Sequence, residues 1–210
     1  QIQSRKFEKK NLLNSINDDK SIRSLSWQDV SEKVICLSNF LMNMGVSKGD
    51  RVMLVSEGRP EWMVSDLAIL GTGAITVPNY TTYTQKDFEF VLNDCQPKGL
   101  FVSNEKLYKT ISDAAKKIDY SFKFVIGFDI IKDAVDYKKI NYDNNPVVCN
   151  CARKDPACII YTSGTQGTPK GVILSHGGIL ANCEDSTNLV KNLKVEAPRF
   201  LTWLPLSHSY

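Results

Sequence analysis

Hydrophobic residues in this chain recur at helical spacing in some segments and form short unbroken runs in others. The clearest helical segment follows Ser26, with Asp29 placed as in a capping box and Gly45 as a stop signal. Its apolar positions are Trp27, Val30, Val34, Leu37, Leu41 and Met44. Because neighbouring members of this series are three or four residues apart, the spacing predicts a helix with one buried face.

Short apolar runs alternate with further helical patterns along the rest of the chain. Strands are predicted at 51–55, 74–77, 99–102, 122–126 and 157–161. Three helices are predicted between them: one begins at Pro60, one is capped by Thr84, and one spans 106–118. Strands that alternate with helices are typical of parallel β–α units joined by right-handed crossovers. The sequence therefore predicts an α/β fold with a mainly parallel sheet flanked by helices.

The same patterns suggest how the chain is organised. Residues 1–24 are polar and are expected to form a lead-in to one domain over 25–210. The polar stretch 129–155 contains an Asn-Asn-Pro turn signal and is the place where two subdomains would separate. The apolar segment 200–206 predicts a strand directly before the last residues, so we expect the domain to be incomplete and the chain to be an N-terminal fragment.

Composition excludes several classes of protein. The 210 residues are 42% hydrophobic, which is globular rather than disordered, and 26 Lys and Arg against 23 Asp and Glu leave a net charge of +3, too balanced for a dedicated nucleic-acid binder. No apolar run approaches the roughly 20 residues of a membrane span, and no signal-peptide pattern is visible. We therefore expect a cytoplasmic protein, with peripheral membrane contact as an open alternative.

Six cysteines are present, at positions 36, 95, 149, 151, 158 and 183. Cys149, Cys151 and Cys158 lack the paired spacing of a zinc site and have no histidine nearby. We expect reduced thiols and no metal ligands within this chain.

The segment 159–176 differs from the rest of the chain. An apolar strand enters a loop rich in Gly, Ser and Thr with one lysine, Lys170, and a second apolar segment follows. Glycines let successive backbone amides converge on an anion, hydroxyl groups add donors, and the lysine adds a positive charge. These are the requirements of a site for a polyphosphate, whereas a flexible linker would rarely lie between two strongly apolar segments.

The loop is not one of the common nucleotide-binding motifs. In a Walker A loop counted from Gly164, Pro169 replaces the second glycine and Gly171 replaces the Ser or Thr that binds magnesium. Gln166 breaks the G-x-G of a dinucleotide-binding fingerprint.

The sequence YTSGTQGTPKG at 161–171 closely resembles the phosphate-loop signature of the AMP-forming adenylating enzymes, which include acyl-CoA synthetases, luciferases and adenylation domains of peptide synthetases. Gln166 stands where the family usually has Thr or Ser. Segments 26–30, 49–62 and 203–208 resemble further family motifs, and 77–84 with 93–98 resembles the long-chain fatty acid branch.

The resemblance implies a two-step reaction. ATP and a long-chain fatty acid would give an acyl-adenylate and pyrophosphate, and coenzyme A would then take the acyl group and release AMP. It implies Mg²⁺ with ATP and two catalytic residues, Lys170 and His208, the latter near the acyl carboxylate; His176 is interpreted as a helix-capping or exposed residue. The implied nucleotide-binding residues are Thr162, Ser163, Gly164, Thr165, Gln166, Gly167, Thr168 and Lys170.

Two other functions stay open from the sequence. An adenylating enzyme for another carboxylic acid would pass the acyl group to a carrier protein, and a non-catalytic ATP-binding protein would keep the loop without the chemistry. A membrane-surface module is disfavoured because the polar face of the helix after Ser26 carries charges of both signs.

Overall fold

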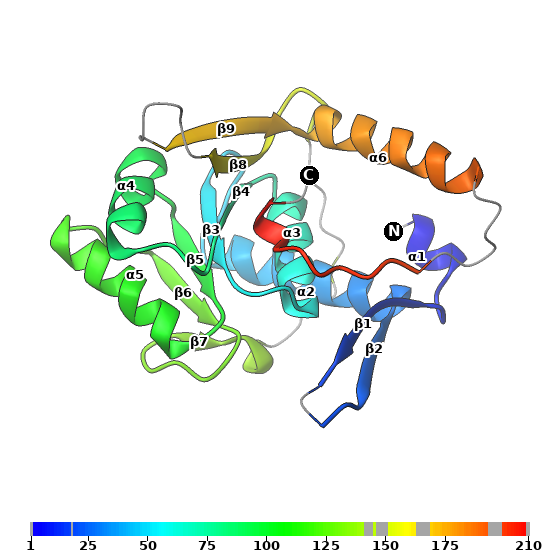
Figure 1. The fold of residues 1–210 in the computed structure, drawn as a ribbon, viewed down its shortest axis with the longest axis horizontal. Helices are drawn as coiled ribbons and strands as arrows, with labels where there is room; N and C mark the ends of the chain where they lie inside the picture. Colours follow the sequence, from blue (N-terminus) through cyan, green and yellow to red (C-terminus); the bar gives the residue numbers. More distant parts are fainter. Residues whose placement is uncertain are drawn as a thin grey trace.

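The computed structural model describes residues 2–17, 19–140, 145, 151–162, 169–192 and 199–208, without the side chains of 2, 3 and 208 (Figure 1). The helices are α1 (Ile2–Lys6), α2 (Trp27–Asn43), α3 (Pro60–Gly71), α4 (Gln85–Cys95), α5 (Glu105–Lys117) and α6 (His176–Asn192), with 3₁₀ turns η1 (Tyr137–Lys139) and η2 (Leu206–His208). The strands are β1 (Asn11–Ile16), β2 (Ile22–Ser26), β3 (Arg51–Val55), β4 (Ile75–Asn79), β5 (Gly99–Val102), β6 (Phe124–Gly127), β7 (Val135–Asp136), β8 (Pro156–Thr162) and β9 (Lys170–Ser175).

The main sheet has seven strands in the order β7-β6-β5-β3-β4-β8-β9. All neighbouring strands in it are parallel except β8 and β9, which are antiparallel. The predicted α/β fold with a mainly parallel sheet is thereby confirmed.

Helices cover both faces of this sheet. Successive side chains of a strand point to opposite faces, so a strand of apolar residues needs a covering layer on each face. Val52 and Leu54 pack in one hydrophobic cluster with α2 and α3, including the fully enclosed Trp62. Met53 and Val55 point to the opposite face and pack with residues of α4 and α5. Figure 1 shows α4 and α5 side by side on that second face.

The predicted helix starts are found where the sequence placed them. Ser26 caps α2 and Thr84 caps α4, each in a capping box with the aspartate three residues later, Asp29 or Asp87. Pro60 is the first residue of α3, where its missing N–H costs nothing. These signals act within one helical turn, which is why the sequence alone reveals them.

Strand β4 runs further than the pattern predicted. Pro78 was expected to close it, yet the strand continues to Asn79. The neighbouring β8 pairs with β4 at Thr76 and not at Pro78, so the proline need not donate a hydrogen bond on that side.

Two segments expected to be irregular contain regular structure. The lead-in 1–24 holds α1 and the hairpin β1–β2, in which Ile16 pairs with Ile22. The connection after residue 129 holds β7, which extends the sheet beside β6, and η1, whose Tyr137 is buried. A two-residue strand is too short to produce a periodic signal, so the pattern could not indicate it. The proposed boundaries at 24 and within 129–155 stay predictions.

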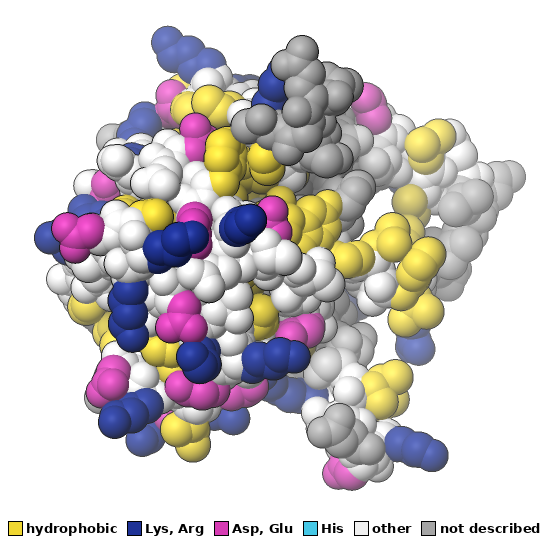
Figure 2. Space-filling model, turned by 60° about the vertical axis from the view of Figure 1, so that its left-hand side comes forward, with side chains coloured by type: hydrophobic (Ala, Val, Ile, Leu, Met, Phe, Trp, Pro, Cys, Tyr) yellow, Lys and Arg dark blue, Asp and Glu magenta, His cyan; other side chains and the backbone are white. Residues whose placement is uncertain are grey.

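The strand predicted at 200–206 is wrong. Residues 199–205 form no ladder with any described strand, and η2 begins at Leu206. Phe200, Leu201 and Trp203 are 74%, 84% and 77% exposed, so their apolar side chains lack the covering neighbours that a strand would give them. Figure 2 shows hydrophobic side chains uncovered on the surface, whereas charges of both signs are interspersed over the body of the molecule.

Candidate functional site

The two apolar segments on either side of the predicted phosphate loop form a hairpin. Strands β8 and β9 pair in antiparallel register, with Thr162 opposite Lys170. Most of the predicted nucleotide-binding residues lie outside the described residues: Ser163, Gly164, Thr165, Gln166, Gly167 and Thr168. The structure therefore fixes the two ends of the loop and the strands that carry it.

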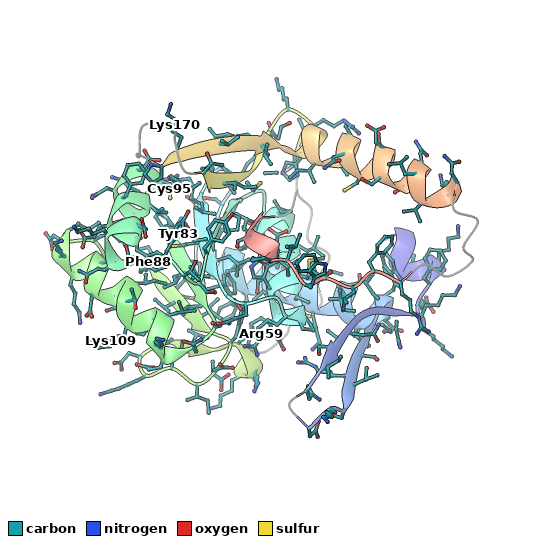
Figure 3. All side chains as sticks on the ribbon, viewed as in Figure 1. Arg59, Tyr83, Phe88, Cys95, Lys109 and Lys170 are labelled. Carbon is teal, nitrogen blue, oxygen red and sulfur yellow. The ribbon has the colours of Figure 1, made fainter. Side chains whose placement is uncertain are left out.

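Both described loop ends have accessible side chains. Thr162 and Lys170 are exposed, and no ion pair joins Lys170 to another residue in the described part of the chain. Figure 3 shows Lys170 at the start of β9 with its side chain directed away from the body of the molecule. A hydroxyl donor and an ammonium group thus lie at the two ends of the same loop, where an anionic ligand could contact both.

Gly171 is required for a reason that the sequence did not reveal. It lies opposite Tyr161 in the ladder, and a Cβ at this position would be 2.9 Å from Ile159 Cγ2 and 3.3 Å from the Tyr161 ring. From the sequence, the glycines of this segment are expected to let backbone amides converge on an anion. At Gly171 the structure shows close side-chain packing instead, since the Tyr161 ring occupies the space of the missing side chain.

We expect Gly171→Ala in the full-length protein to lower the free energy of unfolding by about 1–3 kcal/mol, because the added methyl group overpacks the hairpin. Urea denaturation measures this directly. The matched control is Gly178→Ala, where a Cβ would meet only Ser175 Oγ at 3.6 Å within α6 and alanine is the better helix former. Equal stability of the two variants would contradict this assignment of Gly171.

The two histidines are placed differently. His208 lies in η2, which packs against β4 beside the buried Ser207, but its side chain is not described. His176 is the first residue of α6, as predicted, and its backbone N–H donates to the Asp155 carbonyl oxygen at 3.0 Å. Its side chain is not exposed as expected: it is half-buried, and its Nε2 is buried without a partner among the described residues. The structure does not bring His176 and Lys170 together, since they lie at opposite ends of β9.

The described cysteines differ in burial: three are buried, Cys151 is half-buried and Cys183 is exposed. Within the described residues no disulfide joins Cys36, Cys95, Cys151, Cys158 or Cys183, and Cys149 is outside the described residues. Burial raises the pKa of Cys95 to about 11 and of Cys158 to about 12, which disfavours the thiolate that a metal ion needs. Within the described part of the chain no three His, Cys, Asp or Glu side chains are close enough to hold a metal ion. Nor does any helix there combine the length and apolar character of a membrane span.

A contact between the hairpin and α4 has no signal in the sequence. Tyr161 Oη donates to Asp94 Oδ2 at 2.6 Å, which joins β8 to the last turn of α4. Burial and this hydrogen bond raise the pKa of Tyr161, so its hydroxyl stays protonated and acts as the donor. The residues are 67 positions apart, and no local pattern indicates such a pair.

The chain is similar in sequence to a known family of enzymes and to individual members of known function. A family model described as AMP-binding enzyme matches residues 2–210. The long-chain-fatty-acid–CoA ligase FadD15 of Mycobacterium tuberculosis is 30% identical over 174 residues, and long chain acyl-CoA synthetase 3 of Arabidopsis thaliana is 27% identical over 203 residues. These matches cover 80% and 88% of this chain but only 29% and 30% of the relatives. The chain therefore spans less than a third of the length of these two proteins.

A solved structure shows the same fold. The ATP-bound MatB of Rhodopseudomonas palustris superposes with a TM-score of 0.75 at 24% identity, over 98% of this chain and 40% of that one. At this identity the likeness concerns the arrangement of strands and helices.

Proposed function

The chain belongs to the family of AMP-binding enzymes, and from this premise we propose that the full-length protein is a long-chain fatty acid–CoA ligase. It would activate the acid with ATP to an acyl-adenylate and then transfer the acyl group to coenzyme A. The observation that carries the proposal is the β8–β9 hairpin, which presents a Gly-, Ser- and Thr-rich loop between the exposed side chains of Thr162 and Lys170.

The first step sets one negative charge against another. A carboxylate oxygen attacks the α-phosphorus of ATP, the bond to the β-phosphate oxygen breaks, and pyrophosphate leaves with the additional negative charge. Positioning and charge neutralisation must therefore supply most of the catalysis. Lys170 would offset charge on the leaving β- and γ-phosphates, and the backbone amides and hydroxyls of 162–168 would hold them.

The second step uses the adenylate made by the first. The thiol of coenzyme A attacks the acyl carbonyl, the bond to the AMP oxygen breaks, and a thioester and AMP result. His208 would lie near the acyl carboxylate, a role supported by the resemblance of 203–208 to the family motif.

Magnesium would accompany ATP in the family's chemistry, where it neutralises phosphate charge. Among the described residues no cluster of three or more His, Cys, Asp or Glu side chains surrounds a site for the ion, and phosphate oxygens of ATP are themselves ligands that Mg²⁺ prefers. Lys170 fits the phosphates rather than the metal, since its ammonium group has no lone pair to offer a cation.

The long-chain substrate is favoured by the names of the relatives and by the resemblance of 77–84. We place the protein in the cytoplasm, with peripheral contact at a membrane, where its acid is available.

The test uses the full-length protein with ATP, Mg²⁺ and saturated acids from two to twenty carbons. We expect acid-dependent exchange of labelled pyrophosphate into ATP, with the highest kcat/KM for long chains, and formation of the CoA thioester when coenzyme A is added. Exchange with a short or aromatic acid, or transfer only to a carrier protein's phosphopantetheine thiol, would overturn the proposed substrate or acceptor. Absence of exchange with any acid would favour a non-catalytic ATP-binding protein.

A further inference from the structure

Helix α4 contacts the strand that leads into the phosphate loop. Tyr161 is 2% exposed and lies one residue before Thr162, the last described residue ahead of the loop. Its hydroxyl donates to the Asp94 carboxylate at 2.6 Å, and a hydrogen bond to a carboxylate is stronger than one between neutral groups. We propose that Asp94 and Tyr161 are positioning residues that fix the end of β8 against α4, directly before the phosphate loop, and thereby tighten binding of ATP; this inference rests on the function proposed above.

The ring of Tyr161 is held on several sides. Phe90 of α4 meets it edge-on, with ring centroids 6.1 Å apart and an interplanar angle of 89°. Gly171 on β9 leaves space for it, and the Tyr83 hydroxyl approaches its carbonyl oxygen at 3.5 Å. Because ring, hydroxyl and carbonyl are all in contact, a shift of α4 moves the strand that enters the loop.

Helix α4 is in turn fixed to the centre of the sheet. Arg51 on β3 donates from Nε to the Cys95 carbonyl at 2.7 Å and from Nη2 to the Gln96 carbonyl at 3.1 Å. These bonds satisfy carbonyls at the end of the helix, while the Thr84 capping box satisfies amides at its start. A continuous set of contacts therefore runs from β3 through α4 to Tyr161, one residue before the last described residue ahead of the loop.

A pocket beside the hydrogen bond between Asp94 and Tyr161 affects the choice of variant for testing it. A pocket of about 340 Å³ borders the pair, with Arg51, Gln96 and Ile173 also in its wall. If Asp94 were truncated, a water molecule in this pocket could replace the lost acceptor. Tyr161→Phe removes the donor itself and keeps the ring, so it is the sharper test.

The experiment uses the full-length protein and compares Tyr161→Phe with Tyr120→Phe. The Tyr120 hydroxyl donates to the Pro97 carbonyl just beyond α4, and its ring packs on Phe122, so this control loses a similar contact near the same helix end without touching β8. Pyrophosphate exchange gives kcat and KM for ATP, and thermal unfolding gives the stability of each variant.

For Tyr161→Phe we expect KM for ATP to rise about three- to tenfold, the range of one net hydrogen bond, with kcat changed less than twofold. For Tyr120→Phe we expect an unchanged KM despite a similar decrease in Tm. Asp94→Asn keeps an oxygen acceptor for the hydroxyl but removes its charge, so we expect a rise in KM smaller than that of Tyr161→Phe. Equal KM values for the two tyrosine variants would overturn the proposal.

A second readout separates this inference from the proposed function. Amide hydrogen exchange at 159–162 and 170–173 should be faster in Tyr161→Phe than in the wild type and unchanged in Tyr120→Phe. If the wild-type protein lacks pyrophosphate exchange with every acid, the proposed function fails, and the amide exchange still shows whether the pair holds the hairpin. Equal amide exchange in both variants contradicts the positioning role.

Discussion

Lys170→Ala in the full-length protein is expected to lower kcat/KM for ATP by roughly ten- to hundredfold, the effect of losing one charge-assisted contact of about 1.5–3 kcal/mol. Lys170 is exposed at the start of β9, opposite Thr162, and no ion pair with a described residue occupies its charge. Its ammonium group is therefore available to the β- and γ-phosphates. Pyrophosphate exchange at varied ATP concentration measures the loss.

Two further variants make this result specific. Lys170→Arg keeps the charge but changes its shape, so we expect a smaller loss. Lys109→Ala removes another exposed lysine, on α5, where it pairs with Asp113 and lies away from the hairpin in Figure 3, and should leave the kinetics unchanged. Wild-type kinetics for Lys170→Ala would contradict the assignment of the loop.

Residues 1–210 expressed alone are expected to self-associate and to lack pyrophosphate exchange. No residue of α6 is fully buried, and Leu189, Phe200, Leu201 and Trp203 are each at least 69% exposed. Strand β9 is also the last strand of the main sheet, and no other strand of the described residues pairs with its outer edge, beside which Ile173 is 62% exposed. Apolar side chains and an unpaired strand edge both favour association between chains.

Light scattering and the exchange assay test this expectation side by side with the full-length protein. Double substitution of Phe200 and Trp203 by glutamate should reduce association of the 210-residue chain without creating activity. A monomeric 210-residue chain that exchanges pyrophosphate into ATP would contradict both parts of the expectation.

The sequence predicted those parts of the fold whose signals are local. Capping boxes at Ser26 and Thr84 and the apolar runs 51–55 and 99–102 act within a few residues, and the structure has the expected elements there. The segment 200–206 has the composition of a strand, but strand formation needs a partner, which composition does not supply. The antiparallel pairing of β8 and β9 likewise depends on where the loop returns the chain.

The candidate site divides in the same way. Lys170 and the glycine-rich loop could be found from residue types and spacing, because a phosphate site requires converging donors within a short segment. The contact between Asp94 and Tyr161 joins α4 to β8, which are far apart in the sequence. The need for glycine at position 171 likewise comes from the Tyr161 ring, which packs against it from the neighbouring strand. Residue spacing carries no information about such contacts.

We propose that the loop between β8 and β9 binds the phosphates of ATP. A crystal structure of the full-length protein with a non-hydrolysable ATP analogue would show where the phosphates lie. We predict β- or γ-phosphate oxygens at about 3 Å from Lys170 Nζ, with the amides of 163–168 directed at the same phosphates. A bound nucleotide whose phosphates lie away from this hairpin would contradict the account.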